Sequence, residues 1–204
     1  MKNFKIVLFD LDGVLINSKK NMKISWNEVC KKFKLDIPFE KYFELIGKDF
    51  KEILKDLKIK KNYEEIQDCF KKNSIKNFNL IQLYPKVKKI LSILKRKKIK
   101  IGIVTSKDCL RSRKVLRKFS IFPDIIECSD GKLPGKPNPD KILKILKKFK
   151  IKKANAVYIG DMKVDHSTAK NAGVQYIHSN YGYSKKSIKC KYKINSIADL
   201  LELN

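Results

Sequence analysis

The 204-residue sequence has no long apolar run. None of its hydrophobic stretches approaches the roughly 18–20 residues that a membrane-spanning helix requires. The N-terminal stretch superficially resembles a signal peptide, but its apolar part is only about five residues long and leads into Asp10 and Asp12 instead of small cleavage-site residues. We therefore interpret it as a buried first strand and expect a cytoplasmic protein without membrane association.

Cysteine is scarce, and the five cysteines are widely spaced and odd in number. No Cys-x-x-Cys pair and no Cys/His cluster indicates a zinc site or a disulfide framework. We therefore expect free thiols in a reducing compartment. The cysteines are Cys30, Cys69, Cys109, Cys128 and Cys190.

Arginine is nearly absent from a strongly basic chain. Only four of the 48 basic residues are arginines, and the formal net charge is +27. Proteins that read nucleic acids usually use arginine's planar fork and aromatic stacking. Here lysines are spread over nearly the whole chain at helix-like spacing with Ile and Leu, which is typical of solvated faces in a Lys/Ile/Asn-rich proteome. We expect no specific nucleic-acid binding, although a positive field would speed encounters with anionic substrates.

What is present is a set of short apolar runs separated by amphipathic patterns. A hydrophobic share of 43% and this length predict one well-buried core with room for a small accessory domain. The runs lack alternation, which is typical of parallel strands covered on both faces. The expected strands are 5–9, 99–104, 124–128, 156–159 and 174–178, and the expected helices between the later ones are 85–97, 108–119, 138–149 and 164–172. This alternation predicts an α/β fold with an open, doubly wound parallel sheet.

Residues 16 to 82 contain no convincing strand. Their periodicity favours helices over about 18–33, 39–46, 50–57 and 63–78, with breaks at Pro38, Gly47 and Asn62. We therefore predict an α/β catalytic core formed by residues 1–15 and 83–204 and a small all-helical cap domain formed by residues 16–82.

Polar residues follow four of the predicted strands, at the sheet edge where ligands of open α/β folds bind. They are Asp10 and Asp12, Thr105 and Ser106, the loop 129–136, and Asp161 with Asp165. Carboxylates so close together would repel one another unless a cation lay among them, and oxygen ligands of this kind suit Mg²⁺. A hydroxyl and a lysine opposite the acids would hold phosphate oxygens. The set therefore indicates phosphoryl transfer.

Asp10 and Asp12 have the spacing of two side chains on one side of an extended strand. One carboxylate can then act as the nucleophile while the other handles protons on the leaving group and the water. Taken alone, the pair is equally consistent with solvated turn residues that end a strand. The four strand ends taken together favour the catalytic interpretation.

Four segments carry a family resemblance that spans essentially the whole chain. They are residues 7–15, 101–107, 135–140, and 158–161 followed by Asp165 and the closing pair 172–173. In this order they resemble the motifs of the haloacid dehalogenase-like hydrolase superfamily, in the branch with a helical cap after the first strand. Phosphoglycolate phosphatase-like and β-phosphoglucomutase-like members are the most similar. The resemblance implies a Rossmann-like core with a helical cap.

The resemblance also implies roles for the first and fourth motifs. Asp10 would form a transient aspartyl-phosphate and bind Mg²⁺. Asp12 would be the general acid and base, with its backbone carbonyl reaching the metal, and its presence argues against dehalogenation. Asp161 would be a metal ligand, and Asp165 would orient the metal's waters or the motif lysine.

The other implied roles concern phosphate and substrate. Thr105 and Lys136 would hold the phosphate, with help from the backbone around Leu11 and Ser106. Lys132 competes with Lys136 for the lysine role, and we prefer Lys136 because prolines at 137 and 139 match the family pattern. Lys48 lies in a predicted cap loop where relatives place residues that discriminate substrates, so it is a candidate contact; solvated surface is the alternative.

Further features of the chain receive mainly structural interpretations. Asn17-Ser18 and Met162 depart from the residues common in relatives, and residues 181–183 resemble a Gly-Tyr element of phosphatases. His166 and His178 are expected to be structural.

These inferences predict a Mg²⁺-dependent hydrolase of a small phosphomonoester, such as a sugar phosphate, phosphoglycolate or a nucleotide. Cap closure would exclude water until the phosphoryl group has moved to Asp10. A phosphomutase of the β-phosphoglucomutase type is the alternative, and a non-catalytic basic protein that only inherited the fold is a third reading. Neither the natural substrate nor the oligomeric state can be read from the sequence.

Overall fold

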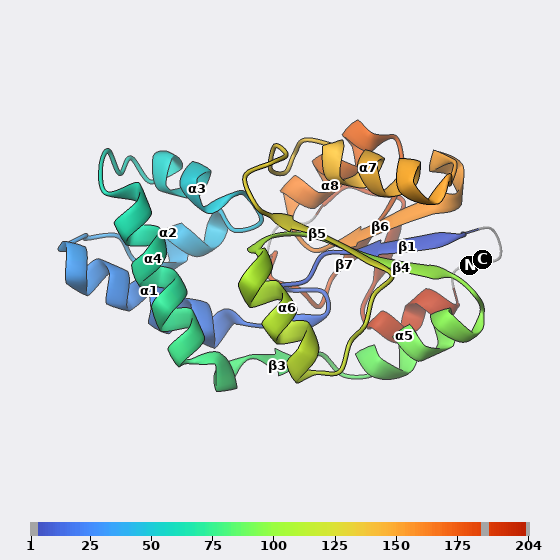
Figure 1. The fold of residues 1–204 in the computed structure, drawn as a ribbon, viewed down its shortest axis with the longest axis horizontal. Helices are drawn as coiled ribbons and strands as arrows, with labels where there is room; N and C mark the ends of the chain where they lie inside the picture. Colours follow the sequence, from blue (N-terminus) through green and yellow to red (C-terminus); the bar gives the residue numbers. More distant parts are fainter. Residues whose placement is uncertain (1–3, 185–187, 203–204) are drawn as a thin grey trace.

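A six-stranded parallel sheet forms the centre of the molecule in the computed structural model, which describes residues 4–184 and 188–202 (Figure 1). The strand order is β5-β4-β1-β6-β7-β8, and every neighbouring pair is parallel. The strands are β1 (Ile6–Phe9), β4 (Lys100–Asp108), β5 (Ile125–Ser129), β6 (Ala156–Gly160), β7 (Gln175–Ser179) and β8 (Tyr192–Ile194). This arrangement confirms the predicted α/β fold class.

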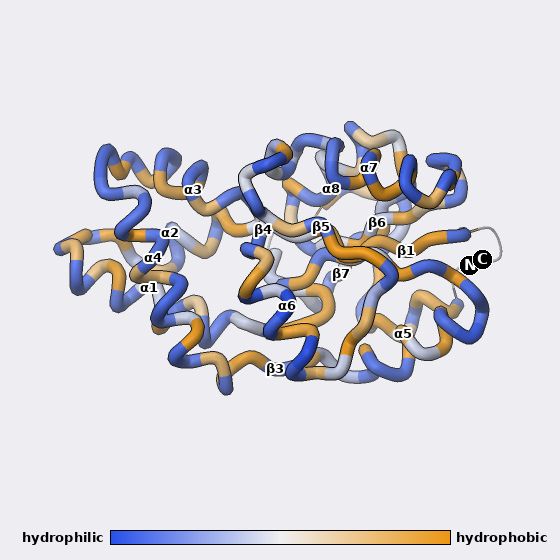
Figure 2. The backbone as a smooth tube through the Cα atoms, viewed as in Figure 1, coloured by the Kyte–Doolittle hydropathy of each residue, from blue (hydrophilic) through white to orange (hydrophobic). Residues whose placement is uncertain are grey.

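The strand β1 shows why its sequence has no alternation. Ile6 and Leu8 belong to one hydrophobic cluster, while Val7 and Phe9 belong to the cluster on the opposite face of the sheet, and all four are fully buried. Because helices cover both faces, every position of the strand faces apolar side chains. The strands are accordingly among the most hydrophobic segments of the backbone (Figure 2).

Helices cover the two faces of the sheet. The helices α5 (Val87–Arg96) and α6 (Cys109–Lys118) pack on one face with the short helix η3 (Ile197–Leu201), and α7 (Asp140–Phe149) and α8 (Lys163–Ala172) pack on the other. The helix α5 buries Val87, Ile90, Leu91 and Leu94, a spacing that places one stripe against the sheet. A further short helix, η2 (Lys153–Asn155), lies between α7 and β6 in the sequence.

The boundaries of most elements differ from the prediction by one or two residues, and the largest difference is at the end of β4. β4 continues through Thr105 to Asp108, so α6 begins one residue later than expected, and the Asp108 carboxylate accepts a hydrogen bond from the backbone amide of Arg111 as the helix cap. β8 was not predicted, because three residues in a lysine-rich segment carry no apolar run.

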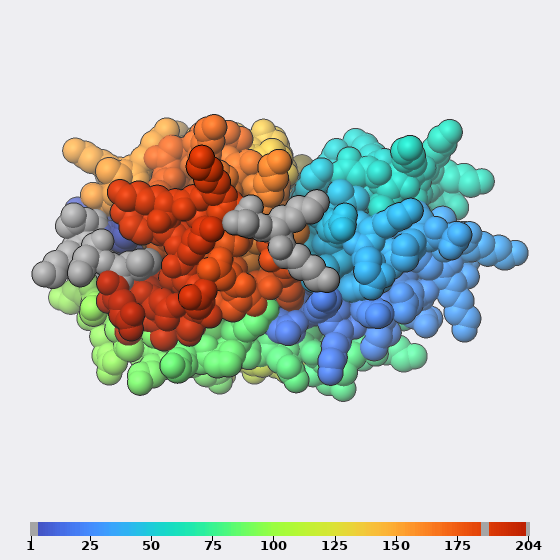
Figure 3. All heavy atoms as spheres, turned by 180° about the vertical axis from the view of Figure 1, so that it is seen from behind, coloured from blue at the N-terminus to red at the C-terminus, as the bar shows by residue number. Residues whose placement is uncertain are grey.

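Four helices between β1 and β4 form a separate unit, which we name the helical unit. They are α1 (Lys19–Phe33), α2 (Phe39–Glu44), α3 (Phe50–Asp56) and α4 (Tyr63–Lys76), followed by η1 (Phe78–Leu80). The unit has its own hydrophobic cluster, in which Trp26 stacks on Tyr42 with ring centroids 4.5 Å apart. It lies beside the core in both views (Figures 1 and 3).

A two-stranded antiparallel ribbon joins the helical unit to the core. It pairs β2 (Ile16–Asn17) with β3 (Gln82–Leu83), so the chain enters and leaves the unit through adjacent backbone segments. The predicted division into residues 1–15 with 83–204 and residues 16–82 stays a prediction, but the ribbon lies at those two boundaries.

The expectation that all cysteines are free thiols is wrong for two of them. Cys109 and Cys128 form a disulfide with Cα atoms 5.2 Å apart. The cause is the pairing of β4 with β5, which places Asp108 opposite Ser129 and so brings their neighbours together. Nothing in a separation of 19 residues reveals that adjacency. Among the described residues, no helix is long and apolar enough to cross a membrane.

Candidate active site

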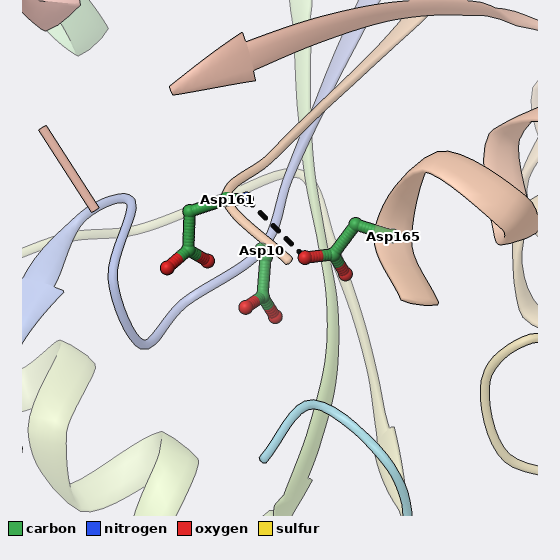
Figure 4. A group of neighbouring side chains, drawn as sticks. All are labelled: Asp10, Asp161 and Asp165. Carbon is green, nitrogen blue, oxygen red and sulfur yellow. Dashed lines mark hydrogen bonds between the residues drawn. The ribbon is translucent and has the colours of Figure 1, made fainter. Parts of the chain in front are cut away.

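Three buried carboxylates meet at the carboxyl ends of β1 and β6. Asp10 follows β1, Asp161 follows β6, and Asp165 lies in the first turn of α8. An oxygen from each lies within 4.8 Å of the others. Figure 4 shows the three side chains next to one another. The backbone amide of Asp10 donates to the carbonyl of Ile159 over 2.8 Å, which extends the sheet pairing to the site and fixes where Asp10 stands.

Lys136 bridges two of these carboxylates. Its Nζ lies 2.8 Å from Asp10 Oδ1 and 2.7 Å from Asp165 Oδ1, and the side chain is buried. Burial alone would lower the pKa of Lys136, but the two carboxylates raise it, so the lysine stays charged. Lys132, the competing candidate, is exposed on the same loop. Of the two lysines, the structure brings only Lys136 to the acids.

Burial makes the acid cluster difficult to ionise fully. It raises the pKa of Asp10 to about 7 despite the attraction of Lys136, and Asp165 and Asp12 add to the rise. Burial and the nearby Asp165 and Asp10 also raise the pKa of Asp161 well above its usual range. Among the described residues, Asp161 Oδ1 has no hydrogen-bond partner. A buried, unpaired carboxylate oxygen beside two further acids is the environment that a cation stabilises.

Gly13 permits the close approach of the first motif to Asp161. Its φ of +87° favours glycine, and a Cβ at this position would lie 2.2 Å from Asp161 Oδ2. The backbone amide of Tyr183 donates to the same oxygen over 2.6 Å. The carboxylate is therefore oriented by backbone on one side and open to a ligand through Oδ1.

Asp12 is held by two groups that the sequence interpretation did not assign to the site. The Ser18 hydroxyl donates to Asp12 Oδ1, and Lys107 Nζ lies 3.1 Å from Asp12 Oδ2. The backbone amide of Ser18 in turn donates to Tyr183 Oη over 2.6 Å. The Asn17-Ser18 departure thus keeps a hydroxyl at the position that contacts Asp12. The position of Lys107 in the second motif, directly after Thr105 and Ser106, was the sequence feature that could have placed it at the site.

The second motif faces both the acids and the helical unit. Thr105 is buried and its Oγ1 accepts from the backbone amide of Lys107 over 3.1 Å. Ser106 Oγ donates to the carbonyl of Gly47 over 2.6 Å, so the core contacts the loop between α2 and α3. Leu11 is fully buried behind Asp10. All three hydroxyl and backbone candidates therefore lie at this edge of the sheet.

Asp165 also organises the start of α8. Its carboxylate accepts hydrogen bonds from Tyr158 Oη over 2.9 Å and from the backbone amide of Met162 over 3.0 Å. Met162, which departs from the family pattern, packs against the hydrophobic cluster of the helical unit. His178 contacts Tyr176, and His166 packs edge-on against the same ring, which fits their predicted structural role.

A cavity of about 70 Å³ lies between the core and the helical unit. The core contributes Asp10, Asp12 and Thr105 to its lining, and the helical unit contributes mainly apolar residues, including Tyr42, Phe50 and Phe70. Lys48 also lines it, but its Nζ lies 2.6 Å from Asp56 and its side chain is 38% exposed. Lys107 and Arg111 complete the cationic groups in the lining.

Comparisons with known proteins agree with this geometry. A family model described as haloacid dehalogenase-like hydrolase matches residues 7–178. The chain is 30% identical to phosphoglycolate phosphatase of Haemophilus influenzae over 89% of this chain and 88% of the relative. It is 28% identical to pyrophosphatase PpaX of Halalkalibacterium halodurans over 97% and 95% of the two chains.

A solved structure shares the fold. CbbY from Rhodobacter sphaeroides, whose structure is a complex with phosphate, superposes with a TM-score of 0.82 at 21% identity and covers 97% of this chain and 96% of its own. The chain belongs to the haloacid dehalogenase-like hydrolase family, as the four motifs predicted. It is a phosphatase of the phosphoglycolate phosphatase-like branch.

Proposed function

We propose that this chain is a Mg²⁺-dependent hydrolase of a small phosphomonoester that works through an aspartyl-phosphate on Asp10. The observation that carries the proposal is the meeting of Asp10, Asp161 and Asp165 within 4.8 Å, with Lys136 bonded to two of them. Burying several carboxylates together costs desolvation free energy, and such clusters are typical of functional sites.

The donor set fits a hard divalent cation. Asp10, Asp161 and Asp165 offer carboxylate oxygens, one of which has no partner among the described residues, and the Asp12 carbonyl would add another oxygen ligand. We assign Asp10 and Asp161 as direct ligands and Asp165 as a residue that orients water ligands and Lys136. When bound, Mg²⁺ would neutralise charge on the phosphoryl group.

The chemistry would then run in two displacements. A carboxylate oxygen of Asp10 attacks phosphorus, the new O–P bond forms, and the bond to the leaving oxygen breaks while Asp12 donates its proton to that oxygen. In the second step Asp12 takes a proton from water, which attacks the aspartyl-phosphate and releases inorganic phosphate and free Asp10. Thr105 and Lys136, with the backbone at Leu11 and Ser106, hold the phosphoryl oxygens.

The helical unit is proposed to act as a cap over this site. Ser106 Oγ and the Gly47 carbonyl join the core to the loop between α2 and α3, and the cavity lies between the two parts. Closure would exclude bulk water from the first displacement. Lys48 is proposed to contact the distal part of a substrate after it leaves Asp56. The relatives' names favour phosphoglycolate among the candidate small phosphorylated substrates and add pyrophosphate to them.

The test measures phosphate release from p-nitrophenyl phosphate with Mg²⁺. Activity should require Mg²⁺, disappear with EDTA, and fall by at least about 10³-fold in Asp10→Asn. Rapid acid quenching should trap one phosphoryl group on a peptide containing Asp10, detected by mass spectrometry. Full activity in Asp10→Asn contradicts the proposal. Conversion of β-glucose 1-phosphate to glucose 6-phosphate faster than phosphate release would identify a mutase instead, and no turnover of any phosphoester would favour a binding protein.

A further inference from the structure

Arg111 reaches from the core into the cavity that holds Asp10. It lies in the first turn of α6, yet only 8% of the residue is exposed, and it lines the cavity together with Asp10 and Asp12. Its guanidinium carbon lies 5.4 Å from the centre of the Phe70 ring on α4. The side chain therefore extends across the cavity from the core to the wall formed by the helical unit.

Among the described residues, the side-chain hydrogen bonds of Arg111 involve one of its three guanidinium nitrogens. Its backbone amide donates to Asp108 Oδ1 over 2.9 Å, and its Nε donates to Asp108 Oδ2. Within the described parts of the chain, no hydrogen bond is made by its two terminal amino groups. Burial alone would raise the pKa of Asp108, but Arg111 lowers it, so the pair stays ionised. Asp108 thus fixes the guanidinium while Nη1 and Nη2 remain available.

The other cations of the lining are already engaged. Lys107 Nζ lies 3.1 Å from Asp12, and Lys48 Nζ lies 2.6 Å from Asp56 near the surface. Arg111 differs from both lysines in that its carboxylate partner, Asp108, accepts from Nε alone and leaves the two terminal amino groups of the guanidinium without a partner among the described residues. A guanidinium presents two parallel N–H donors that match the oxygens of a carboxylate or a phosphate, and an apolar wall strengthens that attraction.

The size of the cavity restricts what can bind between Asp10 and Arg111. Its 70 Å³ holds roughly five ordered waters. With the helical unit in this position, a two-carbon phosphoester or pyrophosphate is on this scale, whereas a hexose phosphate or a nucleotide would have to extend beyond the cavity. The aromatic rings of Tyr42, Phe50 and Phe70 offer no polar group other than one tyrosine hydroxyl to a sugar.

We propose that Arg111 is a specificity-determining residue that binds a second anionic group of a short phosphoester whose phosphate faces Asp10. This inference rests on the proposed function and narrows its substrate class. The second group is a set of anionic oxygens a few bonds from the reacting phosphorus, either a carboxylate or a second phosphoryl group. The positively charged fork selects the anion, and the small cavity selects the length.

The experiment compares two phosphoesters that differ at this end alone and adds pyrophosphate as a third substrate. 2-Phosphoglycolate carries a carboxylate where 2-hydroxyethyl phosphate carries a neutral alcohol, and pyrophosphate carries a second phosphoryl group. Each is assayed with wild type, Arg111→Met, Arg111→Lys and the control Arg113→Met, which changes an exposed arginine on the same helix. Melting temperatures verify folding of each variant.

The wild type should prefer 2-phosphoglycolate or pyrophosphate to 2-hydroxyethyl phosphate by at least tenfold in kcat/KM. Arg111→Met should lose about 100-fold on the preferred anion and less than threefold on 2-hydroxyethyl phosphate, because a buried site built for an anion loses its partner. Arg111→Lys should fall between, and Arg113→Met should match wild type. Which anion loses more in Arg111→Met identifies the second group as carboxylate or phosphoryl.

Two results would overturn the inference. One is a wild type that does not distinguish the charged from the neutral substrate, and the other is an Arg111→Met variant that loses both substrates equally, as a structural role would produce. If Arg111→Met does not fold, calorimetric binding of 2-phosphoglycolate to Asp10→Asn and to Asp10→Asn/Arg111→Lys replaces turnover; equal affinities would refute the role. Failure of the proposed function is distinct, since Asp10→Asn would then retain turnover of every substrate.

Discussion

In the α/β core, the polar groups at the site are buried and bonded to one another; in the helical unit, the side chains facing the same cavity are mostly aromatic or aliphatic. Lys136 contacts two carboxylates on the core side, whereas Tyr42 and Phe70 belong to the hydrophobic cluster of the helical unit. The difference indicates a division of labour. Under the proposed function, the sheet holds the charged groups of the reaction, and the helical unit shapes the cavity and shields it from bulk water.

The division is not complete, because core residues also extend into the helical unit. Met162 and Tyr183 pack against its hydrophobic cluster, and the Tyr183 ring lies 5.1 Å from that of Phe43. Tyr183 also donates its backbone amide to Asp161. Tyr183 thus contacts both a carboxylate of the acid cluster and the helical unit, so it links the position of the unit to the position of Asp161.

The largest expected effect comes from the charge at the centre of the core. Lys136→Met should lower kcat on p-nitrophenyl phosphate by about 10³-fold, because Asp10 and Asp165 lose their shared cation and the phosphate loses a ligand. Steady-state kinetics checks this. Lys132→Met, on the same loop but exposed, should stay within twofold of wild type. Equal losses in both variants would contradict the assignment of Lys136.

The raised pKa values of the core acids predict that Mg²⁺ binding depends on pH. Asp10 has a pKa of about 7 without metal, so below that pH a proton must leave before the cation binds. Apparent Mg²⁺ affinity should fall about tenfold per pH unit below pH 7, and more steeply if Asp161 also releases a proton. Calorimetric titrations from pH 5.5 to 8 measure it; a flat profile would refute the shift.

The raised pKa of Asp10 also predicts how the stability of the metal-free protein changes with pH. Between pH 3.8 and about 7, Asp10 is protonated in the folded, metal-free protein but ionised in the unfolded chain. The folded state therefore binds more protons in this window, and stability from this group is lost as pH rises through it. Metal-free melting temperature should fall from pH 5 to pH 8, and Mg²⁺ should reverse the loss at the higher pH.

Removing the unpaired charge of Asp161 should stabilise the core at the expense of metal binding. Asp161→Asn should raise the free energy of unfolding of the metal-free protein by about 1 kcal/mol, since a buried oxygen without a partner is no longer charged. The melting temperature should rise by about 2–4 °C and no longer respond to Mg²⁺. Asp68→Asn, an exposed control, should change neither the melting temperature nor its response to Mg²⁺. An unchanged or lower melting temperature in Asp161→Asn would show that the buried carboxylate does not destabilise the metal-free protein.

The smallest expected effect lies at the contact between the two regions. Ser106→Ala removes the hydrogen bond to the Gly47 carbonyl, a neutral bond that contributes about 0.5–1 kcal/mol. Turnover should fall about threefold, and the partly buried loop between α2 and α3 should become more sensitive to protease. Ser92→Ala, exposed on α5, is the matched control. A loss larger than 100-fold would show that Ser106 belongs to the chemistry of the core.

The sequence by itself determined the fold class and the acid cluster. Parallel strands present their carboxyl ends at one sheet edge, so polar residues after consecutive apolar runs must converge, and Asp10, Thr105, Lys136 and Asp161 do so. Strand periodicity and order along the chain carry that information without any knowledge of side-chain contacts.

Only the tertiary structure decided which other groups meet these residues. The contacts of Lys107 with Asp12, of Tyr183 with Ser18, and of Cys109 with Cys128 join segments whose spacing in the chain carries no signal. Arg111 looked like one of four scattered arginines until α6 was placed against α4. Its neighbours depend on how the core and the helical unit pack against each other, and packing is a property of the assembled chain, not of any local pattern.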